Sequence, residues 1–566
     1  MLLLLGCDAP DPIESGTREA DSASHDSPHD SPMESEPIVE SDPPDSPTDS
    51  PHDSDVDTAP GTWRSALYPE EWTPDFTDAD GYFLHDFSYA GYHAGEAEPP
   101  DVTERVSALD LGADPTGTSD STSAIQDTID AAAALATADS PVAAWLPAGT
   151  YRVDGTLTVD TSGVVLQGDG TDTTFVFFTQ TEGLDYSAHL RFTGGLTDGV
   201  ELALSADADN RATTVQVADA SAVSVGDEVA VGWVITDDFV SDHEMTGTWV
   251  EFNGEWRAFF RRTVVAVDTA TGTITLDVPL RYPALVRDSA SVRVQTGYLT
   301  EVGLEDIALS NAADWETAWG TTQVHLVALQ DVKDGWVRRV ASWESTWPTD
   351  GEGMHLISSG IEVVDSRRVT IADVELADAA HRGDGGNGYL FEISRSNEVL
   401  TRDSVGRAGR HNFIQNWDFG TSGCVWLRVQ SSDGRSLLGD WDPVGYKSYS
   451  EYHHSLAMAN LVDSAVAEDG WQGVNRQSES SGAGQSVTQS VFWNLSGGGY
   501  LRSLQYGDGY VIGTTDMDVH VDPDEADWNN SGEGTEPTDW TEGLDEGGTL
   551  DPPSLYEDQL SRRLGG

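Results

Sequence analysis

The sequence predicts an all-β protein whose strands stack as the coils of a solenoid, and three observations indicate this. The 566 residues include 57 glycines and are 38% hydrophobic, with many Val, Thr and Ser residues, a composition typical of strands and turns. Short runs alternate apolar and polar residues and end at Gly or Asp. Strand-like runs recur at intervals of roughly two to three dozen residues, as solenoid coils with loops of varied length would.

The chain begins with MLLLLGC (residues 1–7), which resembles the end of a bacterial lipoprotein signal with Cys7 as the lipidated cysteine. Its apolar run is short and lacks basic residues, so we expect the true start codon to lie upstream. A chance apolar start is the alternative. Residues 8–60 are rich in Ser, Asp and Pro and cannot bury apolar surface, so we expect an extended, self-repelling tether. Together these segments predict a bacterial cell-surface protein, either an outer-membrane lipoprotein or a secreted protein.

The net charge of -69, with a pI of about 4.1, limits the partners of the chain. So acidic a surface repels nucleic acids and anionic lipids, so we expect no nucleic-acid partner. No apolar stretch is long enough to span a bilayer, so a lipid anchor would be the sole membrane contact. The charge also argues mildly against a polyanionic sugar, unless Ca²⁺ bridges protein and sugar carboxylates.

The stretch GADPTGTSDSTSAIQDTIDAA (112–132) predicts a short amphipathic helix. Asp120 or Ser121 can accept the first free N–H groups of the helix. The apolar side chains then recur on one stripe, at Ile125, Ile129, Ala132 and Ala133. A helix with one apolar face must cover other apolar surface. The following segments LPAGTYRV and TLTVDTSGVVLQG alternate apolar and polar residues and predict strands.

Residues 106–176 resemble the N-terminal region of the pectate-lyase-like right-handed β-helix superfamily. The resemblance lies in VSALDLGADPTGTSDSTSAIQDTIDAA, LPAGTYRVDGTLTV and GVVLQGDGTDTTF. It implies a right-handed parallel β-helix whose open end is plugged by the helix, since an end coil leaves apolar surface and unpaired strand edges. The resemblance says little about the reaction, because members of the superfamily include polygalacturonases, pectate and other polysaccharide lyases, glucan 1,3-β-glucosidases, epimerases and phage tailspikes.

We expect the β-helix domain to span residues 61–515, with an N-terminal cap at 83–150 around which the aromatic segment 83–100 wraps. Residues 211–295 do not follow the regular spacing of the coils and instead show the patterns of β-hairpins. They therefore predict a β insertion on one side of the β-helix. Residues 516–566 form an acidic tail, and its last segment, SLYEDQLSRRL, predicts a short helix docked on the solenoid.

Reactive side chains are densest between residues 347 and 476, on segments that we expect to be loops of consecutive coils. Coils stack about 4.8 Å apart, so these loops would line one groove. We take as catalytic candidates Asp350, Arg382, Asp384, Arg410, His411, Glu451 and His453. We take as substrate-binding candidates Trp347, Asn387, Trp417, Trp441 and Lys447.

Two mechanisms make different demands on these residues. Glycoside hydrolysis needs two carboxyl groups, one of them protonated, for which Asp350, Asp384 and Glu451 are candidates. Lyase β-elimination needs a base near C5 of a uronate and a cation, Ca²⁺ or Arg, that neutralises the sugar carboxylate. The lyase candidates are Arg382, Arg410, His411 and Lys447. The motifs of polygalacturonases do not decide between the two mechanisms. Their G-H-G and R-I-K motifs are missing from this sequence, and only Asp384 remains of their paired aspartates.

Each cluster also has a purely structural interpretation. Asp384 and Asn387 fit a turn whose side chains cap backbone groups. Asn412 fits an internal ladder, with His411 satisfied by a carbonyl. His453 and its neighbour His454 would point to opposite faces of a strand, so at most one would share the face of Glu451. His381, His411 and His453 could bind a zinc ion together, but no H-x-x-x-H or cysteine spacing supports such a site.

The sequence thus favours a surface protein that cleaves glycosidic bonds of an extracellular polysaccharide, as a lyase or a glycoside hydrolase. The alternative is a non-catalytic β-helix protein that binds carbohydrate or adheres to a partner with the same groove. No cofactor is firmly expected beyond the bridging Ca²⁺ considered above.

Overall fold

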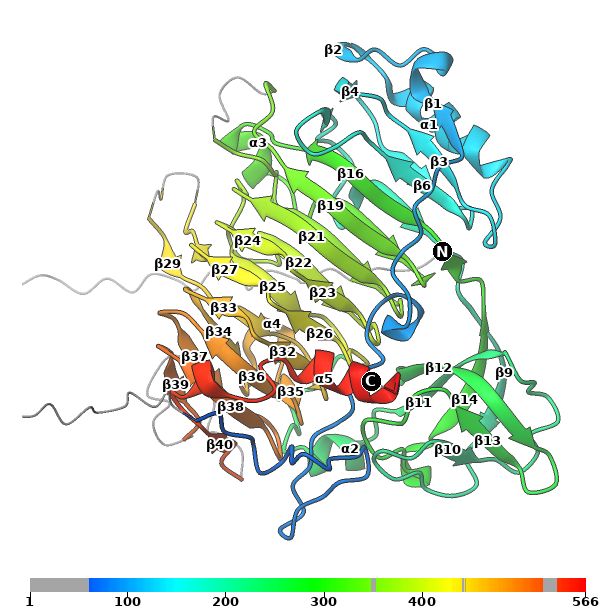
Figure 1. The fold of residues 1–566 in the computed structure, drawn as a ribbon, viewed down its shortest axis with the longest axis vertical. Coiled ribbons are helices and arrows are strands. Elements are labelled where there is room, and N and C mark those ends of the chain that lie inside the picture. The colour runs from blue at the N-terminus through cyan, green and yellow to red at the C-terminus, as the bar shows by residue number, and fades with distance from the viewer. Residues whose placement is uncertain (1–60, 348–352, 440–441, 443, 523–536, 566) are drawn as a thin grey trace, which may run out of the picture. The chain divides into compact units, whose positions relative to one another are not determined.

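Parallel strands stack into the coils of a right-handed β-helix in the computed structural model, which describes residues 61–347, 353–439, 442, 444–522 and 537–565 (Figure 1). The predicted fold class, with its capping helix and β insertion, is confirmed. Most of the runs that the sequence singled out lie in one 18-stranded sheet, the large sheet. Its central strands pair in parallel, with Leu304 opposite Val337 and Val337 opposite Ile371. They are β16 (Gly303–Ser310), β19 (Trp336–Ser342) and β21 (Thr370–Ala377).

The large sheet extends from this centre toward both ends of the stack. Several of its coils carry two short strands on either side of a bend. The earlier strands are β1 (Arg105–Ser107), β2 (Thr116–Asp120), β3 (Val142–Trp145), β4 (Gly149–Val153), β6 (Val164–Gln167) and β7 (Thr174–Phe178). The later ones are β23 (Leu400–Arg402), β24 (Val405–Arg407), β26 (Val425–Leu427), β27 (Gln430–Ser432), β32 (Leu461–Asp463), β33 (Val466–Ala467), β36 (Val491–Ser496), β38 (Tyr510–Thr515) and β40 (Trp540–Glu542).

A second sheet of ten parallel strands, the ten-stranded sheet, forms another face of the coils. Its side chains alternate between a core of aliphatic and aromatic residues and the outer surface. In sequence order its strands are β5 (Leu157–Val159), β8 (Ala188–Thr193), β17 (His325–Gln330), β20 (Ser359–Val364), β22 (Tyr389–Ser394), β25 (His411–Gln415), β30 (Ser450–Tyr452), β34 (Gly470–Gly473), β37 (Tyr500–Ser503) and β39 (Asp518–His520).

A ladder of single-residue bridges, here called the corner ladder, lies where the chain leaves the ten-stranded sheet and turns toward the large sheet. Single residues of successive coils bridge in parallel, in the order Lys333, Arg367, Asn397, Ser422 and Met458. The short pairs β15 (Leu299–Thr300) with β18 (Val332–Lys333), and β31 (Ala457–Met458) with β35 (Val487–Thr488), belong to this corner.

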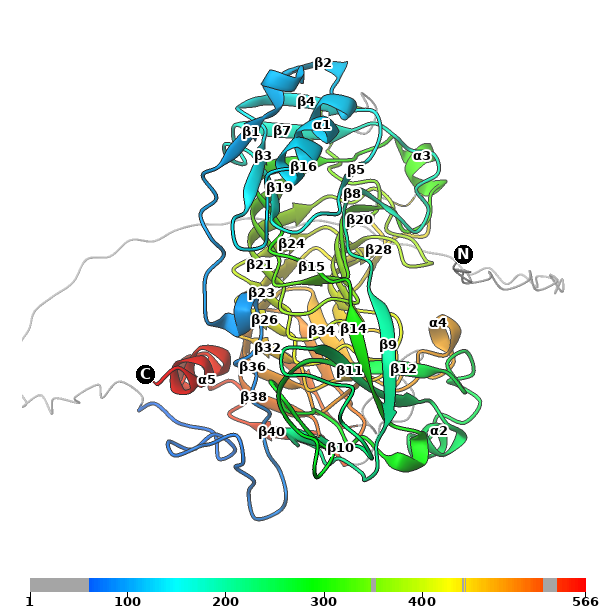
Figure 2. The same ribbon diagram turned by 90° about the vertical axis from the view of Figure 1, so that its right-hand side faces the viewer.

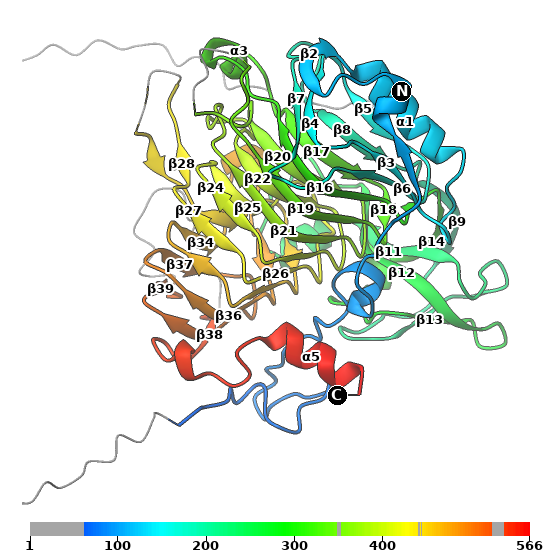
Figure 3. The ribbon, with the colours of Figure 1, turned by 45° about the horizontal axis from the view of Figure 1, so that its top comes forward.

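Helix α1 (Thr122–Ala133) covers the first coils, as the sequence predicted (Figure 3). Ile125 and Ile129 are buried in the main core. Gln126 also donates to the carbonyl of Thr158 and accepts from its N–H, on the edge strand β5. The helix therefore covers the apolar end and satisfies part of an unpaired strand edge.

The β insertion is a six-stranded antiparallel sheet with its own buried core, between β8 and β15. It begins earlier than the predicted residue 211, because β9 already belongs to it. The strands are β9 (Thr197–Ala203), β10 (Thr214–Gln216), β11 (Glu228–Val234), β12 (Trp256–Asp268), β13 (Thr273–Leu276) and β14 (Ser291–Thr296). Helix α2 (Asp237–Asp242) and the short helix η3 (Val286–Asp288) connect them.

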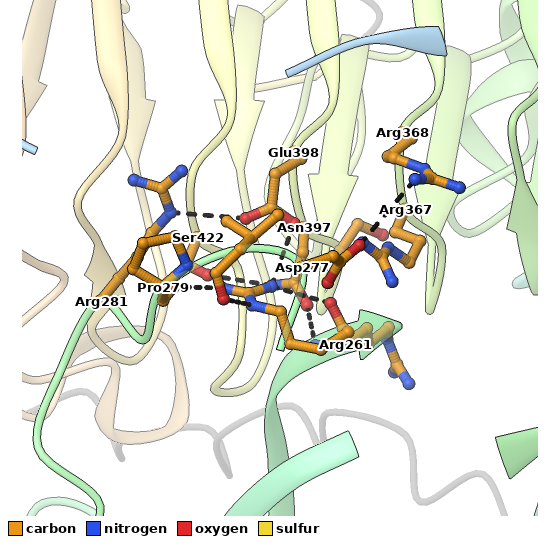
Figure 4. A network of polar contacts seen from close by, with 12 residues as sticks. Arg261, Asp277, Pro279, Arg281, Arg367, Arg368, Asn397, Glu398 and Ser422 are labelled. Atoms are coloured by element: carbon orange, nitrogen blue, oxygen red, sulfur yellow. Dashed lines mark hydrogen bonds and ion pairs between the residues drawn. The ribbon is translucent and has the colours of Figure 1, made fainter. Parts of the chain in front are cut away.

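Buried ion pairs join the insertion to the corner ladder (Figure 4). Arg262 and Arg281 of the insertion both contact Glu398, and neither Arg262 nor Glu398 has any exposed surface. Arg367 of the ladder bonds Asp277 of the insertion at 2.6 Å. Asn397 accepts from the N–H of Arg261. These contacts fix the insertion along several coils.

The N-terminal segment and helix α5 (Leu555–Arg563) cover the outer face of the large sheet (Figure 2). Leu84 and Phe87 pack with Leu400 and Val425 of later coils. The expectation that all of residues 83–100 wrap the first coils is therefore wrong for their first half. Tyr92 does reach the early coils, where it packs with Val165. The short helices η1 (Tyr92–Gly95), η2 (Ala108–Leu111) and η5 (Gly547–Thr549) lie in these covering segments and the cap.

Residues Thr62–Gly566 form one compact unit. Strands β39 and β40 continue the coils past residue 515, where the sequence placed the end of the helix. Cys7 and the predicted tether 8–60 lie outside the described residues. Within the described part of the chain, no helix has the length and apolar character needed to cross a membrane.

Candidate functional site

Two rows of polar side chains run across the outer surface of the ten-stranded sheet. In one row Tyr389 pairs with His411, and His325 lies opposite Ser359. In the other, Glu362 pairs with Glu392. This second row continues through Ile414, Glu451, Gln472 and Arg502. Glu362 lies between the core residues Ile361 and Val363, so its side chain faces outward.

The central contact of this surface is between His411 and Glu451. Nε2 of His411 lies 3.2 Å from Oε1 of Glu451. Nδ1 of His411 lies 2.6 Å from the carbonyl of Tyr449, which requires the proton on Nδ1. Burial lowers the pKa of His411 to about 4. The ring is therefore neutral at neutral pH, and its Nε2 lone pair faces Oε1 of Glu451.

Glu451 is ionised although it is fully buried. Burial raises its pKa, but the charge of Arg476 and the other polar contacts of Glu451 lower it, and the net shift is downward. Nη1 of Arg476 lies 2.9 Å from Oε2 of Glu451, and Gln472 donates to the same oxygen. Glu451 can therefore stabilise an imidazolium on His411 when that ring takes up a proton.

His453 also contacts Glu451, with 3.6 Å between Nε2 and Oε1. Burial, and then the charge of Arg476, lower the pKa of His453 well below its ordinary value. His453 and His454 follow β30 instead of lying within a strand, and their Nδ1 atoms are 3.0 Å apart. The expectation that they point to opposite faces of a strand is therefore wrong. His454 packs against Trp417, with ring centroids 4.4 Å apart.

Tyr389 completes the cluster, with its ring 5.3 Å from that of His411. Burial raises the pKa of Tyr389, so the hydroxyl is protonated at neutral pH. A protonated hydroxyl beside His411 can act as a proton donor. The cluster is nearly closed, since side-chain exposure is 6% for His411, 5% for His453 and 0% for Glu451.

The loops that enter the ten-stranded sheet hold the next group of predicted residues. Arg410 donates to the carbonyl of Gly383 and lies 3.6 Å from Asp384, whose side chain is 98% exposed. Burial lowers the pKa of Arg382. The charged residues that act on Arg382 are Asp378, Arg435 and Asp433, and the histidines of the cluster are not among them.

Asn387 supports the turn interpretation instead of substrate binding. It is buried, donates to the carbonyl of Asp384, and accepts from the N–H of Gln323 and from Ser358. Asn412 is likewise internal, with its amide bonded to Ser431 and Asp469. Both amides connect loops of neighbouring coils.

The other substrate-binding candidates do not meet at the cluster. Trp347 is 46% exposed and stacks near Arg152 of the first coils. Trp417 packs against the core of the insertion. Lys447 is exposed on the hairpin of β28 (Arg435–Ser436) and β29 (Tyr446–Lys447). Asp350 and Trp441 lie outside the described residues.

The insertion positions the loop that carries Arg476. Trp249 of the insertion donates to the carbonyl of Ala483, and the loop turns at Gly482 with φ of +83°. A side chain at Gly482 would meet the backbone of Thr248 at 2.1 Å. The short helix α4 (Glu479–Gly482) and Arg476 are therefore set against the sheet by a segment more than 200 residues earlier in sequence.

Sequence reasoning missed Arg476, Tyr389, Glu392 and Glu362. Tyr389 and Glu392 belong to GYLFEIS, an apolar run that gave no period-two signal. A charged residue within such a run is itself a sign of an outward-facing functional position. Arg476 gave no signal, because its position depends on the fold of the insertion.

A second cluster lies beside the first and contains His325, Glu362 and Glu392. Nε2 of His325 lies 3.0 Å from Oε2 of Glu392, while Asn416 donates to the other oxygen of Glu392 at 2.8 Å. Burial, and then Glu392, raise the pKa of Glu362. In the described part of the chain, the converging groups of three His or carboxylate residues each include a histidine, so an all-oxygen Ca²⁺ site of that kind is not found there.

The family described as "Rhamnogalacturonase A/epimerase, pectate lyase-like" matches residues 105–220. This match confirms the predicted resemblance to the pectate-lyase-like superfamily and reaches past the segment that the motifs indicated. No curated protein matches the sequence.

Three solved structures illustrate what the chain is similar to. The tailspike protein gp49 of Pseudomonas phage LKA1 is 14% identical, with 78% of each chain covered and a TM-score of 0.40. The surface adhesin PfbA of Streptococcus pneumoniae is 10% identical, with 78% of this chain and 91% of that chain covered and a TM-score of 0.37. An exopolygalacturonase from Thermotoga maritima is 10% identical, with 79% and 77% covered and a TM-score of 0.32.

Proposed function

We propose that this protein binds an extracellular polysaccharide on the outer surface of the ten-stranded sheet and cleaves it by β-elimination. The observation that supports this best is the cluster around His411, where a neutral imidazole, a buried carboxylate and an arginine meet. The pectate-lyase-like match over residues 105–220 supports a carbohydrate partner. We further propose a bacterial cell-surface location, through lipidation at Cys7 or secretion.

His411 is the base in this proposal. Nε2, which is buried against Oε1 of Glu451 in the structure, must first turn toward a uronate ring. It then removes the proton at C5, and Glu451 stabilises the imidazolium that forms. The electron pair of the C5–H bond becomes the C4–C5 double bond, and the bond from C4 to the glycosidic oxygen breaks. The Tyr389 hydroxyl donates its proton to that oxygen. Proton transfer from His411 back to Tyr389 through solvent restores both groups.

The cations near the cluster favour an acidic sugar. Arg410 and Arg476 both lower the pKa of His411, and Arg502 lies in the same outward-facing row as Glu451. An arginine beside the uronate carboxylate would stabilise the enolate-like charge that develops on proton removal.

Hydrolysis is a second candidate, supported by the positions of Glu392 and Glu451. Both face outward in the same row and are two strands apart, which corresponds to about 9.6 Å between their backbones. Inverting glycosidases separate their carboxyl groups by roughly 6.5–9.5 Å. The low pKa of Glu451 makes it unsuited to be the acid, so Glu392 would have to take that role.

The test is a screen of uronate-containing and neutral polysaccharides with two readouts, ultraviolet absorbance of an unsaturated product and release of reducing ends. β-Elimination predicts both signals together on an acidic polymer. Reducing ends without absorbance would favour hydrolysis. Binding without either signal on all polymers would overturn cleavage and leave a carbohydrate-binding or adhesion protein.

A further inference from the structure

We propose that His325, Glu362 and Glu392 form a binding site for one divalent cation of the zinc and cobalt type. One potential ligand atom from each residue lies within 4.8 Å of the others. The three residues come from adjacent strands β17, β20 and β22 of the ten-stranded sheet. The inference stands independently of the cleavage reaction proposed above.

The imidazole is oriented as a metal ligand. The backbone of Gln323 accepts a hydrogen bond from the His325 ring, and Nε2 faces Oε2 of Glu392 at 3.0 Å. Metal-bound histidines commonly donate their other ring N–H to a backbone carbonyl, which fixes the ring. Asn416 holds Glu392 in the same way, by donating to the oxygen that does not face His325.

The charge of the cluster also fits a dication. Glu362 and Glu392 are direct cross-strand partners, so their carboxylates repel each other. Glu392 is only 5% exposed and Glu362 is half-buried, so water screens this repulsion only in part. One imidazolium neutralises one carboxylate, whereas one dication neutralises both and leaves the imidazole neutral. The nearby Arg395 is already paired with Asp365 at 2.9 Å.

The ligand types decide which metal fits. Ca²⁺ and Mg²⁺ take oxygen ligands, whereas imidazole nitrogen with carboxylates suits Zn²⁺ and related ions. Three protein ligands leave a fourth tetrahedral position for water or a substrate oxygen. Tyr389 is on the same strand as Glu392, so that fourth position would lie on the surface proposed to bind the polysaccharide.

A second triad provides a matched control. His93, Glu301 and Asp334 also meet the distance criterion. The His93 side chain is 46% exposed, however, and Asp334 is already bonded to Arg368 at 2.6 Å. Glu301 accepts from the Tyr92 hydroxyl. Because its carboxylates already have partners, we expect no tight metal binding at this triad.

The experiment titrates the metal-free full chain with Co²⁺ and records its visible d–d absorption. An acidic surface binds cations loosely as hydrated ions, which lack the intense bands of tetrahedral Co²⁺ with an imidazole ligand. The intact protein should bind one Co²⁺ with such bands, and Zn²⁺ should displace it. His325→Asn and Glu392→Gln should weaken this binding by at least about 10-fold, and H93N should not.

Two results would overturn the proposal. One is the absence of tetrahedral Co²⁺ bands in the intact protein. The other is unchanged bands in H325N and E392Q. If these two variants unfold, Glu362→Gln replaces them, because Glu362 is the most exposed of the three residues, and the same loss of bands is required.

Discussion

Nε2 of His411 lies 3.2 Å from Oε1 of Glu451, although 40 residues separate them and Glu451 has no exposed surface. The carbonyl of Tyr449 binds the other nitrogen of the ring, so the Nε2 lone pair is the reactive one. Arg476 keeps Glu451 ionised. Coils that follow each other in the stack bring these groups together.

Replacement of His411 by alanine should lower kcat by roughly 10²–10⁴-fold, because this removes the general base. The matched control is His381→Ala, since His381 is also buried with its pKa lowered to about 4 but packs against Trp319 outside the cluster. Steady-state rates and melting temperatures of both variants should be compared. Equal losses of activity in the two variants would show that His411 has only a structural role.

The rate should depend on pH through His411. Its pKa is about 4, below the ordinary value of 6.5, so the neutral base persists into mildly acidic solution. We expect kcat/KM to fall as the pH drops through about 4 and to be unaffected near pH 6.5. Return of each sample to neutral pH controls for acid unfolding. A midpoint near 6.5, or a rate that rises on acidification, would contradict this assignment.

Replacement of Glu398 by glutamine should lower the free energy of unfolding by about 3–5 kcal/mol, because Arg262 and Arg281 would remain buried without a counterion. The control is Glu255→Gln, which removes an exposed carboxylate from Arg257, leaves Arg257 paired with Asp418, and should cost at most about 1 kcal/mol. Urea denaturation measures both. Similar values for the two variants would mean that the buried pairs do not hold the insertion on the helix.

Stability should fall on acidification between about pH 6.5 and pH 4. Burial lowers the pKa values of His189 and His243 to about 4, so in this range the unfolded chain binds more protons than the folded one. Each such histidine contributes roughly 3 kcal/mol that is present above pH 6.5 and lost as the pH falls to about 4. Denaturation curves at several pH values should show this slope.

Two variants, His189→Gln and His93→Gln, test this explanation. His189→Gln should flatten the slope of stability against pH, because it removes a buried histidine. The second should not, because Glu301 raises the pKa of His93 and its contribution has the opposite sign. A slope that is unchanged in H189Q would refute this explanation of the acid sensitivity.

The sequence predicted the large sheet better than the ten-stranded sheet, for a physical reason. Runs such as VGLEDIALSN and RRVTIADVELAD became β16 and β21 because they alternate over several residues and end at turns. Strands such as β30, with only Ser450–Tyr452, are too short to show a period. Their existence depends on pairing with neighbouring coils.

The candidate site was predicted in part. Because consecutive coils align, His411, Glu451 and His453 were expected to meet, and they do. The position of Arg476 depends on contacts between its loop and the insertion, and no local pattern encodes such contacts. The pairing of Arg262 with Glu398, 136 residues apart, is unpredictable for the same reason.

The most direct test of the central claim is a crystal structure of the His411→Ala variant with an oligosaccharide of the best-bound polymer. We predict sugar density across β22, β25 and β30, with a glycosidic oxygen beside the Tyr389 hydroxyl. Sugar bound only elsewhere, such as between helix α5 and the large sheet, would contradict the proposed site.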